Sequence, residues 1–168
     1  MTFFELASER YSVRKFKDTP VPKETVQKIL AAGRLAPTAC NKQPQEILVV
    51  DSPEGLAKLR KCTECHYGAP LAFIVCYDKE KAWRREYDGK CSGDVDAAIV
   101  STHMMLEAWE QGIGSTWVMY FIPEAVMTEF ALPENIVPVS ILVMGYADAE
   151  PSPRHFDRKD PEDAVSYR

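Results

Sequence analysis

One apolar run, Leu71-Ala72-Phe73-Ile74-Val75-Cys76-Tyr77, indicates how the chain is layered. The run is apolar on both faces and rich in branched and aromatic side chains, which is typical of a strand covered by helices on both sides. A second stretch, residues 95–109, repeats apolar side chains at helical spacing until Gly112. This spacing predicts a long helix deep in the core, beside a central sheet.

Shorter patterns predict the remaining elements. Ser52 is a natural N-cap for a helix with Pro53 at its first position, and prolines precede the first apolar helical pattern. In chain order we expect a helix ending at Pro37, a strand at 47–50, a helix from Pro53, the strand 71–77, the helix 95–112, a strand at 114–120, a helix from Pro123 and a strand at 139–144. Residues 5–17 show no regular spacing of apolar side chains. Residues 78–93 are rich in charged side chains and are expected to form a solvated loop or an exposed helix without chemistry.

Length and composition place the chain among single globular domains. It has 168 residues, 46% of them hydrophobic, so we expect one domain over 1–168 with a polar tail at 148–168 that frays or is held by a partner surface. A net charge of −5 argues against a nonspecific grip on nucleic acid or membrane. The start of the chain has no signal-peptide pattern, and five scattered cysteines fit reduced thiols, so we expect a cytoplasmic protein.

The pentapeptide Arg10-Tyr11-Ser12-Val13-Arg14 carries the donors that a phosphate monoester needs. In an extended segment, Arg10, Ser12 and Arg14 point to the same side. Arginine gives a rigid fork of charge-assisted hydrogen bonds to phosphate oxygens, and serine adds one neutral bond. Taken alone, the two arginines also fit exposed, solubilising charge.

Two further segments suit a flat ligand. Residues 36–45 frame Asn41 and Gln43 with small residues, and these amides match the alternating donors and acceptors of a heterocycle, although they also suit a connecting loop that caps the helix. Residues 112–117 are glycine-spaced, but they lead from a helix into a strand, the reverse of a dinucleotide fingerprint or P-loop. We therefore exclude both nucleotide motifs.

The segment Cys62-Thr63-Glu64-Cys65-His66 is a lone Cys-x-x-Cys. No second pair exists at structural zinc spacing, so we expect no metal site. No serine or cysteine lies in a nucleophile-elbow context, and His103 fits a helix residue better than a base. This pattern favours an enzyme whose bound cofactor carries the redox chemistry.

Read together, these segments resemble the nitroreductase family of FMN-dependent oxidoreductases. The family's Arg-x-Ser-x-Arg-x-Phe is present at 10–16, and its Ala-Pro-Ser-x-x-Asn-x-Gln-Pro is present at 36–44 with Thr38 in place of serine. The resemblance continues through Asp96-Ala97-Ala98 and 112–117. It implies an α+β fold, with a mixed or antiparallel central sheet flanked by helices, assembled as an intertwined homodimer.

The resemblance also implies a set of FMN-binding residues. Arg10, Tyr11, Ser12 and Arg14 would hold the phosphate and the ring edge, while the tail would reach the phosphate with Arg158 and Lys159. Pro37, Thr38, Ala39 and Asn41, with Gln43 as a lesser candidate, would come from the other subunit and close over the isoalloxazine. Ser115, Thr116 and Trp117 would pass near the flavin. No side chain is expected to be catalytic, because flavin N5 carries the chemistry.

The implied activity is reduction of nitroaromatic, quinone or similar acceptors by NAD(P)H in a ping-pong cycle. Other flavin chemistry on the same scaffold remains open, namely dehalogenation, ene reduction or flavin fragmentation. So does a non-catalytic FMN-binding carrier or redox sensor. A third alternative is a non-flavin domain in which Cys62 and Cys65 form a redox or metal pair. Longer family members insert helices that roof the flavin, and the short chain has little room for them, so acceptor and donor preference cannot be carried over.

Overall fold

An antiparallel four-stranded sheet in the order β1-β2-β4-β3 forms the centre of the computed structural model, which describes residues 1–168. Its strands are β1 (Gln45–Val50), β2 (Leu71–Asp78), β3 (Gly114–Val118) and β4 (Ile136–Gly145). The α-helices are α1 (Phe3–Glu9), α2 (Lys23–Leu35), α3 (Pro53–Cys62), α4 (Gly93–Glu110) and α5 (Pro123–Glu129). Short 3₁₀ turns are η1 (Ala39–Asn41), η2 (Pro153–His155) and η3 (Pro161–Asp163).

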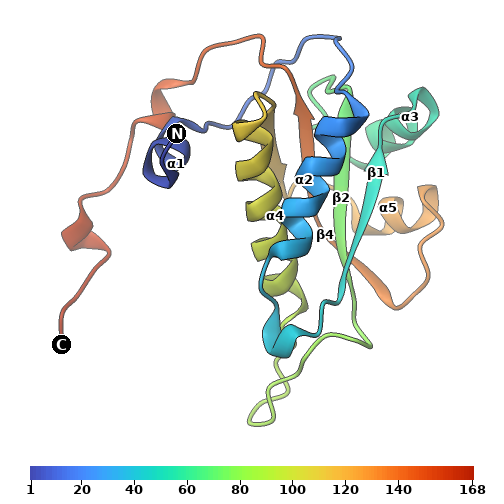
Figure 1. The fold of residues 1–168 in the computed structure, drawn as a ribbon. Helices are drawn as coiled ribbons and strands as arrows, with labels where there is room; N and C mark the ends of the chain where they lie inside the picture. Colours follow the sequence, from blue (N-terminus) through green and yellow to red (C-terminus); the bar gives the residue numbers. More distant parts are fainter.

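The sheet lies between two helical layers, α2 with α4 on one face and α3 with α5 on the other (Figure 1). Strand β2 shows the alternation: Phe73 packs in the core cluster with α2 and α4, while Ile74 packs in the cluster with α3 and α5. Both side chains are fully buried. The expectation of a two-sided, helix-covered strand at 71–77 is therefore confirmed, and the sheet is antiparallel.

Strand β4 is longer than its apolar pattern predicts. It begins at Ile136, three residues before the expected start, and includes Pro138. A proline cannot donate to the ladder, and the register between β2 and β4 shifts at Val75/Cys76, opposite this proline. This irregularity allows the strand to continue through Pro138, a residue that the sequence pattern places outside the strand.

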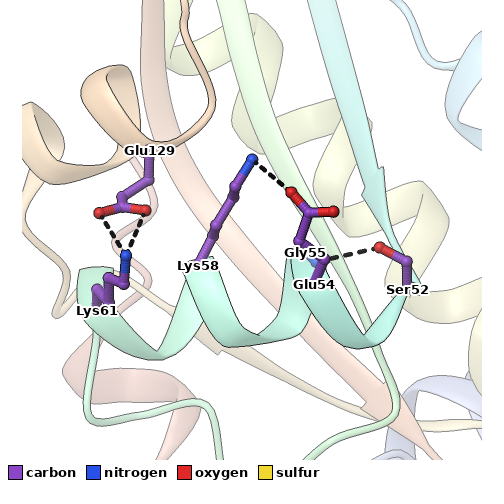
Figure 2. Close-up of polar contacts among 6 residues, drawn as sticks. All are labelled: Ser52, Glu54, Gly55, Lys58, Lys61 and Glu129. Atoms are coloured by element: carbon purple, nitrogen blue, oxygen red, sulfur yellow. Dashed lines mark hydrogen bonds and ion pairs between the residues drawn. The ribbon is translucent and has the colours of Figure 1, made fainter.

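Hydrogen bonds and ion pairs fix the start of helix α3 and its position beside α5 (Figure 2). The Ser52 hydroxyl accepts a hydrogen bond from Gly55 N–H at 3.1 Å, as its N-cap pattern predicts. Glu54 and Lys58 pair at 3.2 Å one turn apart. Lys61 then reaches Glu129 on α5 at 3.0 Å, so an ion pair joins the two helices of this layer.

Helix α1 was not expected, because residues 5–17 lack an apolar period. It is held by a capping box: Thr2 Oγ1 accepts from Glu5 N–H, and Glu5 accepts from Thr2 N–H. None of its residues is buried, and Phe3 and Phe4 are exposed. A helix without a buried face leaves little signal in the sequence.

The tail after β4 leaves the body of the molecule and runs past α1 (Figure 1). Its first part contacts the rest of the chain. Asp148 pairs with Lys15 at 2.9 Å and donates its N–H to Lys15 O, and hydrogen bonds at Ala149 and His155 follow. Phe156, Val165 and Tyr167 are exposed on it. No helix combines the length and the apolar character needed to cross a membrane.

Candidate functional site

The segment that follows α1 lies against the free edge of β3. Val13 N–H donates to Ser115 O at 3.0 Å, and Thr116 Oγ1 donates to Val13 O. A Cβ at Gly114 would lie 2.5 Å from the Val13 side chain, so glycine is needed for this close approach. Ser115 and Thr116 are buried. The Ser115 backbone and the Thr116 side chain therefore support the Arg10–Arg14 segment from inside the protein, while Ser115 Oγ is buried without a hydrogen-bond partner.

The tail is brought to the same segment by two contacts. Tyr11 Oη donates to Ala149 O at 2.7 Å, while its ring packs edge-on against Trp109 with centroids 5.1 Å apart. His155 Nε2 lies 3.1 Å from Ser8 O and its ring stands 6.1 Å from that of Tyr11. Tyr11 thus links the N-terminal segment, the end of α4 and the tail.

These contacts enclose a polar hollow of about 160 Å³, which we call the anion pocket. Its lining residues come from both ends of the chain: Arg10, Tyr11, Ser12, Arg14, Ser152, Arg154, His155 and Arg158. The pocket has four guanidiniums and no carboxylate, and none of the four forms an ion pair.

Electrostatics show that the anion pocket is short of negative charge. Burial lowers the pKa of Arg10, and the positive charge of Arg158 lowers it further. Arg14 makes one long bond, from Nη1 to Ser12 O at 3.4 Å. A bound anion would relieve the repulsion and use the free donors, and guanidinium forks with a serine hydroxyl suit a phosphate.

The sequence predicted most of this lining but not all of it. Arg10, Tyr11, Ser12, Arg14 and Arg158 meet in the anion pocket, whereas Lys159 does not line it. In the tail, the lining arginines are Arg154, within the 3₁₀ turn η2, and Arg158, three residues after that turn ends. Arg154 and His155 were missed, because only the fold shows which part of a polar tail docks.

A second hollow, of about 410 Å³, lies where β3 ends and is called the β3-end hollow here. It is lined by Arg60, Lys61, Cys62, Thr63, Glu64, Tyr120, Phe121 and Ile122. Thr63 Oγ1 donates to Tyr120 O at 2.5 Å and accepts from Cys65 N–H at 3.0 Å. This network fixes the turn after α3 against the segment that follows β3.

Tyr67 lies in the turn after α3, close to Arg14 of the anion pocket. The neighbouring Cys65 thiol raises the pKa of Tyr67, desolvation adds to this, and the nearby Arg14 guanidinium opposes it. The backbone of Tyr67 is left-handed, with φ 50°. Sequence reasoning missed Tyr67 and Thr63, since nothing in the sequence brings this turn beside residue 14.

The predicted loop over the ring is strained and exposed. Cys40, Asn41 and Gln43 all have positive φ, between 49° and 52°. The loop is held from inside: Gln43 N–H donates to Thr38 Oγ1 at 3.0 Å. Pro37, Cys40, Asn41 and Gln43 are all exposed, while Thr38 and Ala39 are half-buried.

A buried carboxylate anchors this loop to the start of α4. Ala39 N–H donates to Asp96 Oδ1 at 2.8 Å, and Ser92 Oγ donates to Asp96 Oδ2 at 2.7 Å. Tyr11, at the anion pocket, packs on Trp109 near the other end of α4. Asp96 and Trp109 are thirteen residues apart on that helix, about 20 Å at 1.5 Å per residue. One chain therefore does not bring the two predicted halves of the site together (Figure 1).

The Cys-x-x-Cys segment does not form a cluster. Cys62 Sγ is buried and contacts Lys58 O at 3.4 Å, and desolvation raises the pKa of its thiol. His66 Nδ1 accepts from Gly68 N–H at 3.0 Å. No group of three or more His, Cys, Asp or Glu side chains is placed to hold a metal ion.

Trp117, which was predicted to pass near the flavin, packs half-buried in the layer of α2 and α4.

Sequence relatives named as NAD(P)H nitroreductases and NADPH-dependent oxidoreductases place this chain among the NAD(P)H-dependent oxidoreductases. The profile described as "Nitroreductase family" matches residues 7–67 and 60–146. The chain therefore belongs to the nitroreductase family, as the sequence resemblance implied.

Known proteins agree with this assignment. A crystal structure of a nitroreductase family protein from Clostridium difficile 630 is 46% identical, with a TM-score of 0.95 over 99% of this chain and 98% of that one. An FMN-dependent nitroreductase from Clostridium difficile R20291 is 28% identical, with a TM-score of 0.80 over 98% of each chain. A Methanothermobacter thermautotrophicus protein, provisionally named NADH dehydrogenase/NAD(P)H nitroreductase, is 33% identical over 96% of this chain and 85% of its own length.

Proposed function

We propose that this chain binds FMN and reduces nitroaromatic, quinone or similar acceptors with NAD(P)H in a ping-pong cycle. The observation that carries the proposal is the anion pocket, with four arginines, a serine hydroxyl and no acid. A phosphate monoester fits this donor set. A similar protein whose name states FMN dependence supports the choice of flavin.

The chain's residues divide the binding between two places. Arg10, Arg14 and Arg158 would anchor the phosphate, while Tyr11 holds the tail in place as one wall. The flavin ring would lie toward the β3-end hollow, because residues 12–13 pack beside Ser115 near the start of β3 and the hollow lies just after the end of that strand. Thr63 and Tyr120 border that hollow, and the hydrogen bond between them fixes the wall against which the ring would pack.

The second half of the site would come from another copy of the chain. The Pro37–Gln43 loop is held at the start of α4 and Tyr11 packs near its end, about 20 Å apart along the helix, so the loop lies away from the anion pocket of its own chain. A two-fold dimer places the same patch of each chain against its partner and generates two equivalent sites. Exposed Phe3 and Phe4, beside a hollow of about 640 Å³ between α1 and α4, provide apolar surface for it.

When bound, FMN supplies hydride transfer at N5, so the side chains need only bind, orient and exclude water. The guanidiniums of the anion pocket fix one end of the cofactor. The strained loop at Cys40–Gln43 has a shape preset before binding, which avoids ordering a flexible segment. No side chain is assigned as an acid, and solvent can supply the proton. We place this chemistry in the cytoplasm, where five free thiols stay reduced.

The visible spectrum of the purified protein tests this proposal. We expect a flavin spectrum that NAD(P)H bleaches under anaerobic conditions and that a nitroaromatic or quinone restores. Bleaching without reoxidation by any acceptor would favour a redox sensor. A protein that contains no flavin and takes up no FMN would contradict the proposal and favour the thiol alternative. Sedimentation at micromolar concentration should show a dimer, and FMN should raise its melting temperature by mass action.

A further inference from the structure

The hairpin at 79–92, between β2 and α4, is built more tightly than an exposed loop requires. Arg85 N–H donates to Lys90 O at 3.0 Å, Gly89 N–H donates to Arg85 O at 2.8 Å, and Ser92 N–H donates to Trp83 O at 2.9 Å. Its outer residues are exposed, as the charge pattern predicts, but Trp83 and Cys91 are half-buried. The hairpin stands out below the start of α4 (Figure 1).

The inner side of this hairpin borders a hollow of about 360 Å³, called the hairpin hollow here. Trp83, Val95 and Ile99 give it an aromatic and aliphatic lining. Val95, in the first turn of α4, is 53% exposed, so its side chain is accessible to a ligand in the hollow. A flat conjugated ring packs well on an indole face and aliphatic walls.

The rim of the hairpin hollow is positive. Arg85 and Lys90 lie on it, and Lys90 has no carboxylate partner. Arg85 is held by Asp88, with Nε to Oδ1 at 2.8 Å, which fixes its position. Residues 79–92 carry five Lys and Arg against three Asp and Glu, in a chain of net charge −5. Local positive charge in an acidic protein favours an anionic ligand.

The one acid in the lining, Asp96, is turned toward the protein and keeps its donors there, so the anionic group of a ligand is expected at the rim, beside Lys90. Both oxygens of Asp96 already accept hydrogen bonds, from Ala39 N–H and Ser92 Oγ. These bonds tie the hairpin, the start of α4 and the Pro37–Gln43 loop into one rigid unit. Ala39 itself lines the hollow, so the hollow and the loop share a wall.

We propose that the hairpin hollow binds the non-reacting part of an electron donor or acceptor, a flat conjugated molecule that carries an anionic group. This inference rests on the proposed function, because it places the ligand beside the loop that closes over the partner's flavin. Trp83, Val95 and Ile99 hold the flat part, and Lys90 pairs with the negative group. The hairpin thereby binds a ligand, whereas the sequence pattern predicts a solvated segment without chemistry.

Two substrate pairs that differ in negative charge test the proposal on the holoenzyme. The first pair is 4-nitrobenzoate and 4-nitrobenzamide, and the second is NADPH and NADH. We expect Lys90→Ala to raise KM for the more anionic member of one pair by about threefold to tenfold relative to the other member, as for one partly exposed charge contact. Lys90→Arg should keep most of the parent preference. A response in the first pair identifies the acceptor as the ligand, and a response in the second identifies the donor.

Lys58→Ala is the matched control, because Lys58 lies on α3 with its ammonium paired to Glu54. If Lys90→Ala leaves both ratios at the parent value while FMN content is normal, the proposal is wrong. A binding assay separates this result from failure of the flavin assignment. Benzoate should quench tryptophan fluorescence more strongly than benzamide, and both Trp83→Tyr and Lys90→Ala should remove the difference. Charge-dependent quenching in a protein that takes up no FMN would support the ligand site in the hairpin hollow and refute the flavin assignment. Absence of charge-dependent quenching in FMN-loaded protein would refute the ligand site.

Discussion

Arg10 and Arg158, from opposite ends of the chain, line one pocket without a carboxylate between them. Burial lowers the pKa of Arg10, and the charge of Arg158 lowers it further. Assembling these like charges costs free energy, and a phosphate dianion would offset that cost. Cofactor binding and docking of the tail are therefore expected to be coupled.

Arg14→Ala should weaken FMN binding about tenfold to a hundredfold, because a charge-assisted bond to a phosphate contributes about 1.5–3 kcal/mol. Arg14→Lys should recover only part of the loss, since a point charge lacks the planar fork. Fluorescence titration of the apoprotein measures the affinity. The control is Arg168→Ala, at an exposed arginine outside the anion pocket. Equal affinity of Arg14→Ala and the control, in folded dimers, would show that Arg14 is surface charge.

Tyr11→Phe keeps the ring packing on Trp109 but removes the hydrogen bond to Ala149 O. We expect FMN affinity to fall about twofold to tenfold, the contribution of one net hydrogen bond, and the tail to be cut faster by protease. Tyr87→Phe is the matched control, because Tyr87 is 97% exposed on the hairpin. Unchanged affinity together with unchanged proteolysis would mean that this bond does not hold the tail.

Replacing both Cys62 and Cys65 with serine should leave FMN content and reductase rate within a few-fold of the parent. Cys62 Sγ lies in the core and its hydrogen bond is to a backbone carbonyl, which a serine hydroxyl can also reach, and no metal cluster surrounds the pair. Metal analysis and steady-state rates provide the measurement. A stoichiometric metal in the parent that disappears with activity in the variant would revive the thiol alternative.

The free energy of unfolding is expected to depend on pH through Asp78, at the end of β2. Its bonds to Asn135, Glu80 N–H and Lys81 lower its pKa from 3.8 to about 2. The ionised carboxylate therefore stabilises the fold above pH 3.8, and this contribution is lost as the pH falls from 3.8 to about 2. Asp78→Asn should lose less stability than the parent over that range in thermal unfolding, while Asp51→Asn, at an exposed carboxylate, should follow the parent. A parent-like acid slope in Asp78→Asn would refute the link.

Much of the fold follows from short-range patterns. The apolar run at β2, the Ser52 cap and the helical repeat of α4 each predict an element that the structure contains, because burial on a defined face sets their periodicity. Helix α1 has no buried face, and β4 passes through Pro138, so the spacing of apolar residues does not predict helix α1 or the full length of β4. Tertiary packing decides these parts.

The candidate site was only partly predictable for a related reason. Arg10, Ser12 and Arg14 are close in sequence, and their spacing together with the family resemblance predicts a phosphate ligand. Arg154 and Tyr67 reach the same region by docking of the tail and of a left-handed turn, which no local pattern encodes. The charges at 79–92 read as solvated, because the inward position of Trp83 depends on the hairpin.

The central claim is that each FMN site combines the anion pocket of one chain with the Pro37–Gln43 loop of another. Its most direct test is FMN stoichiometry in a mixed dimer, purified through two different tags, of an anion-pocket variant, Arg10→Ala with Arg14→Ala, and a loop variant, Ala39→Phe. Either variant alone should bind little FMN. The mixed dimer contains one intact site, and we predict that it binds one FMN per dimer. A mixed dimer as empty as its two parents would contradict the account, because it would place the pocket and the loop of each site within one chain.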